Sequence, residues 1–247
     1  MAVNRPFRRT VRQFSSGSYA DSGQSRYILH PKYSMDGAHY VRALKIIQKD
    51  LFSLFDFIEP SNVNLQSYSF RTHELLMRTC IEIEANFKAI LSENGYAKNG
   101  NWNINDYKRV ETSHFLSSYY VEIPVWREGP WTIRPFEDWT AEGRPEWYQA
   151  YNAAKHDRHT AFPKANFENL LKAVCGLVVL ISSQFRNEDF SRRSSFLIIG
   201  DLGDGFEDST AGFFRIKYPK DIPQELRYDF SWQALEKEAD PFENFAF

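Results

Sequence analysis

Hydrophobic residues recur every three or four positions over three long stretches of the chain, which is the spacing of helices buried along one side. The first stretch covers 36–58 and the second covers 67–93, where a left-handed turn at Asn94-Gly95 is expected to end the helix. The third, 164–186, is apolar on most sides, so we expect it to be the central core helix. The second helix is predicted to bury Phe70, Leu75, Leu76, Cys80, Ile83, Phe87, Ile90 and Leu91.

The rest of the chain shows shorter elements. A further helix is expected over 104–116, and a β-hairpin over 119–135 with its turn at Gly129-Pro130. Prolines in both arms of the hairpin favour edge strands or extended loops. A helix opening at 144–147 is expected to run to about Lys155–Arg158, with Phe162-Pro163 breaking it. The C-terminal part predicts strands at 195–199 and 212–218, then a short helical turn and an aromatic tail within 232–247.

These elements together predict a mainly α fold. We expect a helical bundle over 35–186 with a short β-hairpin insertion, an N-terminal tail over 1–34, and a β-containing C-terminal extension over 187–247 packed on the bundle. The tail carries four arginines, which suit either a solvent-exposed linker or an arm that contacts phosphate. They are Arg5, Arg8, Arg9 and Arg12.

Composition narrows the classes of function. The net charge is −2, so nucleic-acid binding would need a local basic patch rather than a global field. Cys80 and Cys175 lie in apolar helical patterns, which favours small buried hydrophobes over a disulfide. The longest apolar run, 173–181, is short for a membrane span, and no apolar stretch follows the basic N-terminus as in a secretory signal. We therefore expect a cytoplasmic protein without a membrane partner.

The stretch 147–159 holds the densest group of chemically active side chains. On a helix Asn152 and His156 share one face, and His159 lies three residues further if the helix continues that far. The neighbouring stripe carries Tyr151, Lys155 and Arg158. Such a surface could hold a phosphate, with a histidine that exchanges a proton near neutral pH. The alternative is structural: these groups cap the helix C-terminus and bond to nearby loops.

Other candidate sites are weaker. Glu82 and Glu84 are two residues apart, so they point to different sides of a helix and do not form a carboxylate pair. One of them could reach across the bundle to His156 or Lys155; otherwise both are solvated or salt-bridged. The loop at 200–205 lacks the ligand spacing of a calcium loop and is typical of a β-turn. The remaining histidines are scattered and no nucleotide or cofactor motif occurs, so we expect no metal and no cofactor.

The order of elements and the segment from Tyr151 to Arg158 resemble the HEPN superfamily of helical bundles. The hallmark of that family is an arginine, a polar residue, three variable residues and a histidine. Asn152 and His156 match the polar and histidine positions, and Tyr151 stands at the arginine position. The Tyr-Asn-x-x-Lys-His-x-Arg pattern is similar to that of several members. The resemblance covers roughly residues 36–186.

The resemblance implies two functions. The first is a helical module for RNA-related or regulatory interaction, catalytically degenerate because Tyr151 replaces the arginine. The alternative is a metal-independent endoribonuclease of toxin or phage-defence type, in which His156 handles a proton and Asn152 orients the substrate. Arg158 would replace the missing arginine only if the helix ends near Lys155 and the chain turns back. The family implies a homodimer and possible RNA, with Lys155, Tyr151 and His159 at the phosphate and Glu82 and Glu84 in support.

Overall fold

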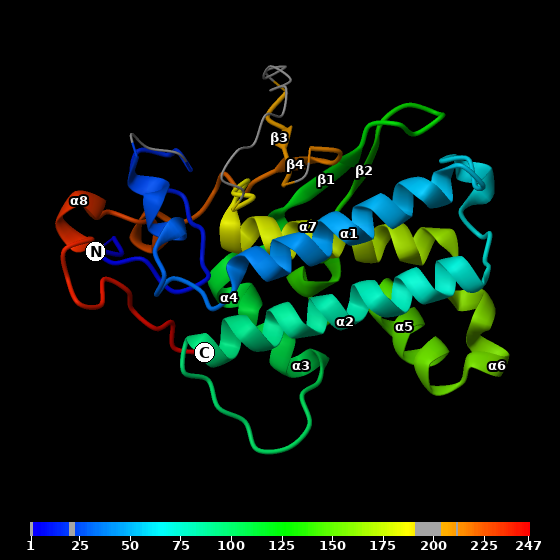
Figure 1. Cartoon of the computed structure of the whole chain (residues 1–247), viewed down its shortest axis with the longest axis horizontal. Coiled ribbons are helices and arrows are strands. Elements are labelled where there is room, and N and C mark those ends of the chain that lie inside the picture. The colour runs from blue at the N-terminus through cyan, green and yellow to red at the C-terminus, as the bar shows by residue number, and fades with distance from the viewer. Residues whose placement is uncertain (1, 20–22, 191–203, 211) are drawn as a thin grey trace.

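The computed structural model describes residues 2–19, 23–190, 204–210 and 212–247 of the chain. Within these residues, eight α-helices are joined by a small four-stranded antiparallel sheet (Figure 1). The mainly α fold with a β-hairpin and a small additional β element is therefore confirmed.

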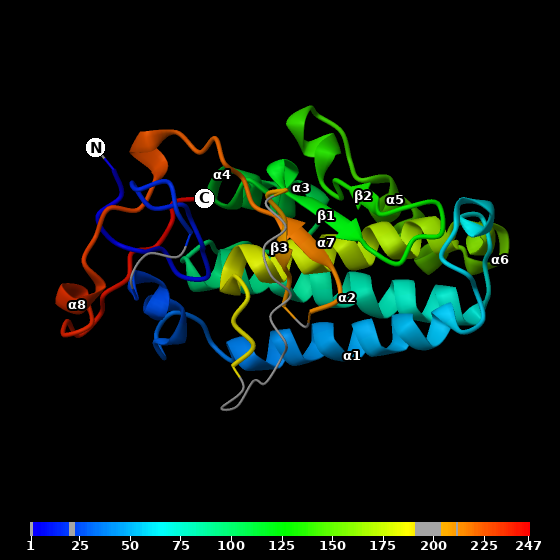
Figure 2. The ribbon, with the colours of Figure 1, turned by 90° about the horizontal axis from the view of Figure 1, so that it is seen from above.

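Three long helices form the body of the bundle and run side by side along its length (Figures 1 and 2). They are α1 (Gly37–Phe55), α2 (Phe70–Glu93) and α7 (Phe167–Phe185). Each lies within a stretch of helical periodicity, which confirms the three predictions. Gly95, with φ of 85°, ends α2 in the expected left-handed turn.

Helix α7 is the centre of the core, as its all-round apolar pattern predicted. Every one of its residues except Glu168 and Lys172 is buried. Helices α1, α2 and α5 (Glu146–His156) pack on it. A Cβ added to Gly176 would lie 3.3 Å from the Trp147 ring, so this glycine lets α5 approach closely. Cys80 and Cys175 are buried free thiols beside this core, as expected.

By length and composition alone, α7 is also apolar enough to cross a membrane. In the structure, 89% of the apolar window of α7 is buried inside the protein. The core helix of a globular protein passes the same length and composition test, and the burial of α7 is what such a helix shows.

The stretch 104–116 differs from the continuous helix that was expected. It forms α3 (Ile104–Tyr107) and α4 (Glu111–His114), joined by a 3₁₀ turn at Lys108–Val110. Its buried apolar residues Ile104, Tyr107 and Val110 recur at intervals of three, which is the repeat of a 3₁₀ helix rather than an α-helix. The two remaining helices are short: α6 (Arg158–Ala161) and α8 (Trp232–Leu235).

The sheet combines the predicted hairpin with the C-terminal part of the chain. Its strands are β1 (Tyr120–Ile123), β2 (Trp131–Ile133), β3 (Glu207–Asp208) and β4 (Arg215–Lys217), in the order β2-β1-β4-β3. The expectation of two edge arms is wrong for β1, because β4 pairs with its free side and Pro124 lies just beyond it. Strand β3 forms where only a connection was expected, and the predicted strand at 195–199 lies outside the described residues.

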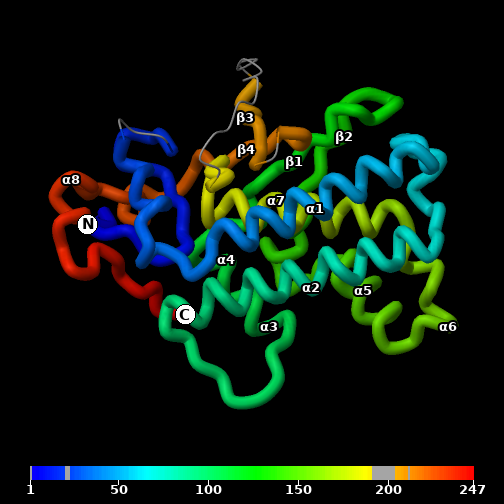
Figure 3. Tube along the Cα trace, viewed as in Figure 1, coloured from blue at the N-terminus to red at the C-terminus, as the bar shows by residue number. Residues whose placement is uncertain are grey.

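Residues 2–19, which we call the N-terminal strap, cross the C-terminal end of α7 and interlace with the last segment of the chain (Figure 3). The Val11 N–H donates to the carbonyl of Ser183 at 2.8 Å. Arg9 donates to Gln184 Oε1 at 2.8 Å and lies 2.7 Å from a Glu93 carboxylate oxygen. The last carbonyls of a helix need such donors, and a cation is favoured there.

The prediction that the arginines of the tail are solvent-exposed or free to contact phosphate is wrong for Arg9 and Arg12, which are 0% and 1% exposed. Arg12 donates to the backbone carbonyls of Ser113 and Leu226, both at 3.1 Å. Burial lowers the pKa of its guanidinium. Three phenylalanine rings lie 5.0 to 5.6 Å from that guanidinium: Phe7, Phe115 and Phe245.

His114 is sealed beneath the strap. Its Nε2 lies 2.8 Å from the Arg9 carbonyl oxygen and its Nδ1 lies 2.6 Å from Ser113 Oγ. Burial lowers the pKa of this imidazole from 6.5 to about 3, and nearby Arg12 adds to the shift. The neutral ring fits this site, with Nε2 donating to the carbonyl and Nδ1 accepting from the serine.

The depressed pKa predicts a pH-dependent stability. In the unfolded chain His114 binds a proton near pH 6.5 and in the folded chain only near pH 3. The stability that this difference in proton binding gives the folded protein is complete above pH 6.5 and is lost as the pH falls towards 3. We expect the free energy of unfolding to drop by about 1 kcal/mol more between pH 6.5 and 5.5 in the wild type than in His114→Gln.

Urea unfolding at both pH values measures this difference. His39→Gln, at an exposed histidine, is the matched control and should keep the wild-type pH dependence. Identical pH dependence in the wild type and His114→Gln would contradict the prediction.

Candidate functional site

Helix α5 ends at His156, because Asp157 leaves the helical conformation with φ of −137° and ψ of 75°. The Asp157 carboxylate then caps α6: it accepts the Thr160 N–H at 3.2 Å and the Thr160 hydroxyl. Asp is a preferred residue at such a start. Helix α5 thus ends within the predicted range of Lys155–Arg158, and His159 does not continue the face of Asn152 and His156.

The break leaves an exposed basic corner. His156, Arg158 and His159 are all exposed, and their side chains make no hydrogen bond or ion pair within the described part of the chain. In a continuous helix Arg158 would point away from His156, so Arg158 could replace the arginine missing from the motif only if the helix ended before it. Helix α5 does end before Arg158, at His156. An exposed, unpartnered His156 also does not fit the structural alternative for this residue.

Glu84, rather than His156, organises the polar contacts of α5. The Tyr148 hydroxyl donates to Glu84 Oε1 at 2.9 Å, and Lys88 lies 4.0 Å from the same carboxylate. Burial raises the pKa of the Tyr148 phenol, and the nearby Asn152 side chain offsets a small part of this rise. The expectation that a glutamate reaches α5 is therefore correct, but its partner is Tyr148 instead of His156 or Lys155. Sequence reasoning missed Tyr148 because its aromatic ring fits the core pattern.

Tyr151 and Lys155 form a pair of their own. Lys155 Nζ donates to Tyr151 Oη at 3.1 Å and lies 5.1 Å from the centre of the ring. This bond raises the pKa of Lys155, while burial raises that of Tyr151. Tyr151 thus stays a neutral phenol and brings no positive charge to the motif position where the family carries arginine. Glu82 is half-buried, and its side chain makes no hydrogen bond or ion pair with α5 among the described residues.

Three aromatic rings gather beside the basic corner. The Phe162 ring lies 4.9 Å from that of Phe70 and 5.7 Å from that of Tyr68, measured between centroids. Phe70 is 64% exposed and Tyr68 51%, so the prediction that Phe70 belongs to the buried stripe is wrong. Phe70 is the first residue of α2 and projects beyond the core, where its ring contacts that of Phe162. The signal that could have found it is its position next to the Ser69 cap.

Basic side chains flank these rings. Phe162 follows α6 with helical dihedral angles, so Arg158 lies one turn before it on the same side. Arg71 and Lys164 are exposed nearby in sequence, and Arg71 pairs only with Glu74 at 3.3 Å. We call this group the end surface: Tyr68, Phe70, Phe162, Arg71, Arg158 and Lys164. Its helices lie at the end of the bundle away from both termini (Figure 1).

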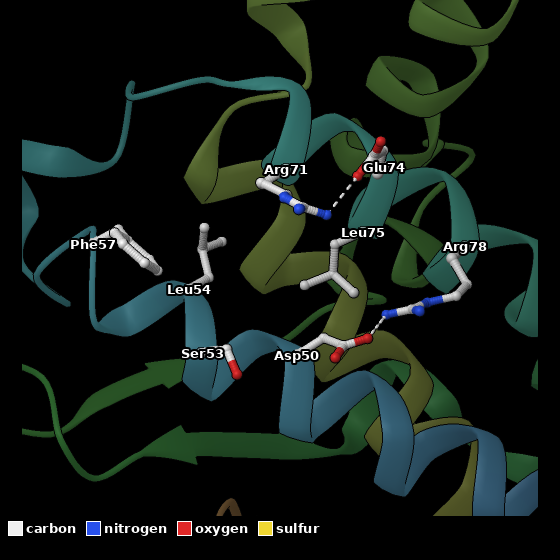
Figure 4. Close-up of a pocket in the computed structure, with 8 residues that line it drawn as sticks. All are labelled: Asp50, Ser53, Leu54, Phe57, Arg71, Glu74, Leu75 and Arg78. Carbon is white, nitrogen blue, oxygen red and sulfur yellow. Dashed lines mark hydrogen bonds and ion pairs between the residues drawn. The ribbon is translucent and has the colours of Figure 1, made fainter.

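A groove of about 520 Å³ lies between α1 and α2 next to the end surface (Figure 4). Leu75 lies between its two ion pairs, and Leu54 lies to their side, towards Phe57. Arg71 pairs with Glu74, and Arg78 pairs with Asp50. Because each charge in the groove already has a partner, the groove offers no free charge to an ionic ligand.

In the part of the chain that the structure describes, no group of three or more histidine, cysteine, aspartate or glutamate side chains is placed to hold a metal ion. In comparisons with known proteins, no protein family, no curated protein and no solved structure matches this chain.

The exposure of His156 predicts that its side chain does not support folding. We expect His156→Ala to change the free energy of unfolding by less than about 0.5 kcal/mol, as at other exposed positions. Tyr148→Phe removes the hydrogen bond from the Tyr148 hydroxyl to the Glu84 carboxylate. We expect this change to lower the free energy of unfolding by about 1.5 to 3 kcal/mol, as for hydrogen bonds to charged groups.

Urea unfolding of the two variants beside the wild type tests this. An unfolded or strongly destabilised His156→Ala protein would show that the histidine is structural after all.

Proposed function

We propose that the chain is a HEPN-like helical module that binds single-stranded RNA through the end surface and the basic corner at His156. The observation that carries the proposal is the placement of exposed aromatic rings beside cations that have few partners. Proteins that bind single strands combine these two features, since bases stack on the rings and phosphates contact the cations.

The charge of the protein favours local rather than global attraction. The net charge is −2, so binding must come from a patch. Around Phe162 the cations Arg158 and Lys164 have no carboxylate partner among the described residues, whereas Asp157 is engaged by Thr160. An unpaired base could stack on Phe70 or Tyr68 while its phosphate meets Arg158. A duplex keeps its bases stacked on each other, so it fits this surface less well.

Removal of Arg158 should weaken RNA binding. We expect Arg158→Gln to lower the affinity for a single-stranded oligoribonucleotide about fivefold, on the order of 1 kcal/mol. Because one cation is lost, the slope of log K against the logarithm of the salt concentration should become shallower by about 0.7. Fluorescence anisotropy over a range of salt concentrations measures both effects.

Arg42→Gln is the matched control, because Arg42 is exposed in the first part of α1. That end of α1 lies at the opposite end of the bundle from α6 (Figure 1). Phe70→Ala should weaken binding of single strands and leave duplex binding unchanged. If the wild type binds no RNA, or if Arg42→Gln weakens it as much as Arg158→Gln, the proposed function fails.

One observation favours a second candidate, the metal-independent ribonuclease. The helix ends at His156, which meets the first of the two conditions under which Arg158 could serve in place of the missing arginine. In this reaction His156 takes the proton of a ribose 2′-hydroxyl, whose oxygen attacks the adjacent phosphorus. The bond between phosphorus and the 5′-oxygen breaks, that oxygen takes a proton from solvent water, and a 2′,3′-cyclic phosphate remains. Arg158 would stabilise the charge on the phosphate, and a second copy of the chain could complete the site.

The ribonuclease candidate predicts cleavage of RNA in the presence of EDTA with 2′,3′-cyclic phosphate ends. His156→Ala should lower the rate at least about a hundredfold, as loss of a general acid or base does. The urea unfolding measurement above shows whether the His156→Ala variant is still folded. Binding without cleavage, or equal cleavage by both proteins, would leave the non-catalytic module as the function.

A further inference from the structure

A second group of cations lies at the sheet. A cavity of about 380 Å³ opens where β2 and β4 end, and Arg134, Lys217 and Lys220 line it. The sheet register explains the meeting of residues so distant in sequence. Ile133 of β2 and Ile216 of β4 both pair with Val121 of β1, from opposite sides. The next residues of the two strands, Arg134 and Lys217, therefore flank the preceding residue of β1.

That preceding residue is Tyr120, whose ring fixes the two cations. The Arg134 guanidinium lies 5.1 Å and the Lys217 ammonium 5.6 Å from its centre. Both distances are typical of cation–π contacts. Tyr120 thus holds one cation from each neighbouring strand on the wall of the cavity.

The cations of this cavity lack acidic partners. In the described ranges, no carboxylate oxygen lies within ion-pair distance of Arg134, Lys217 or Lys220, although Asp221 also lines the cavity. Arg215, two residues before Lys217, shows the contrast: it pairs with Glu122 and with Asp204, each at 2.8 Å. Arg134 donates from Nη2 to the Ser117 carbonyl at 2.8 Å, while its buried Nε has no partner.

The two lysines also converge on a single glycine. Lys220 Nζ lies 3.1 Å, and Lys217 Cε 3.7 Å, from the point where a Cβ on Gly205 would sit. Like charges brought together without a counter-ion repel each other, and a bound anion would relieve that repulsion.

We propose that this cationic pocket, defined by Arg134, Lys217 and Lys220, binds a phosphate-bearing ligand. An arginine fork and lysine ammoniums are the side chains that proteins use for phosphate groups. The volume of the cavity is within the range of about 300 to 1,000 Å³ found for small-molecule sites, so there is room for more than a single phosphate. The cations already cover the Tyr120 ring, so the pocket recognises charge rather than a stacked base. The site is independent of the end surface.

Inorganic pyrophosphate is the probe, and isothermal titration of the full chain at constant ionic strength is the measurement. We expect the wild type to bind pyrophosphate and Lys217→Gln to bind it about tenfold more weakly. Lys220→Gln, at an exposed side chain that cannot impair folding, should weaken binding in the same direction. Lys49→Gln, at an exposed lysine of α1 outside the pocket, is the matched control and should bind as the wild type does.

A second arm separates two sources of the phosphate. An oligoribonucleotide with a 5′-phosphate is compared with the same oligonucleotide ending in a 5′-hydroxyl. Tighter binding of the phosphorylated strand that disappears in Lys220→Gln identifies an RNA end as the ligand. Equal binding of the two strands, with pyrophosphate still bound, identifies a free phosphate compound.

Two results overturn the proposal. One is the absence of pyrophosphate binding by the wild type at millimolar concentrations. The other is equal affinity of the wild type, Lys217→Gln, Lys220→Gln and Lys49→Gln, which would mark a non-specific effect of charge.

Discussion

The structure depends on one helix that has no polar face. Helix α7 is buried around almost its whole circumference, so every side of it must be covered by another element. Helices α1 and α2 cover one side, α5 another, and β1 lies against it as well. Burial of apolar surface on this scale is the main favourable contribution to folding. Gly176 shows how tightly the cover fits, since the Trp147 ring occupies the space of a side chain.

The C-terminal end of α7 imposes a different demand, because its last turn is polar and still buried. Ser183 and Gln184 offer carbonyls and an amide that must be bonded away from water. The N-terminal strap supplies the donors through Val11 and Arg9. Gln184 in turn donates to Asn86 Oδ1 of α2 at 2.9 Å, which joins the strap, α7 and α2 in one network. Arg9 and Arg12 are therefore buried in the closure of the bundle and are not available to a ligand.

At the opposite end of the bundle Asn166 and Gln66 join the start of α7 to the segment before α2, and rings and cations beside them remain exposed. The break at Asp157 turns the chain and presents Arg158 and Phe162 on one side of α6. In the cationic pocket at the sheet, positive charges also lack acidic partners, although Arg215 on the same strand is fully paired. Exposed cations without an acidic partner, such as Arg42 and Lys49, occur elsewhere in the described chain as well. These two surfaces differ in what surrounds the cations: exposed rings at the end surface and a shared cavity at the sheet.

The sequence by itself determined the three long helices, the central place of α7, the two buried thiols and the hairpin. Apolar periodicity and turn residues are local signals, and they report which face of an element is buried. Within the candidate site it placed Asn152 and His156 on one helical face and put Lys155 beside Tyr151.

Only the tertiary structure decided that Glu84 bonds to Tyr148, that Arg9 and Arg12 are buried, that Phe70 is exposed, and that β1 is a central strand. Each of these depends on a partner far away in the chain: β4 reaches β1 from about a hundred residues later, and Arg9 meets Glu93 and Gln184. Whether a charge is paired, or a ring covered, is a property of such long-range contacts, and a local pattern does not contain it.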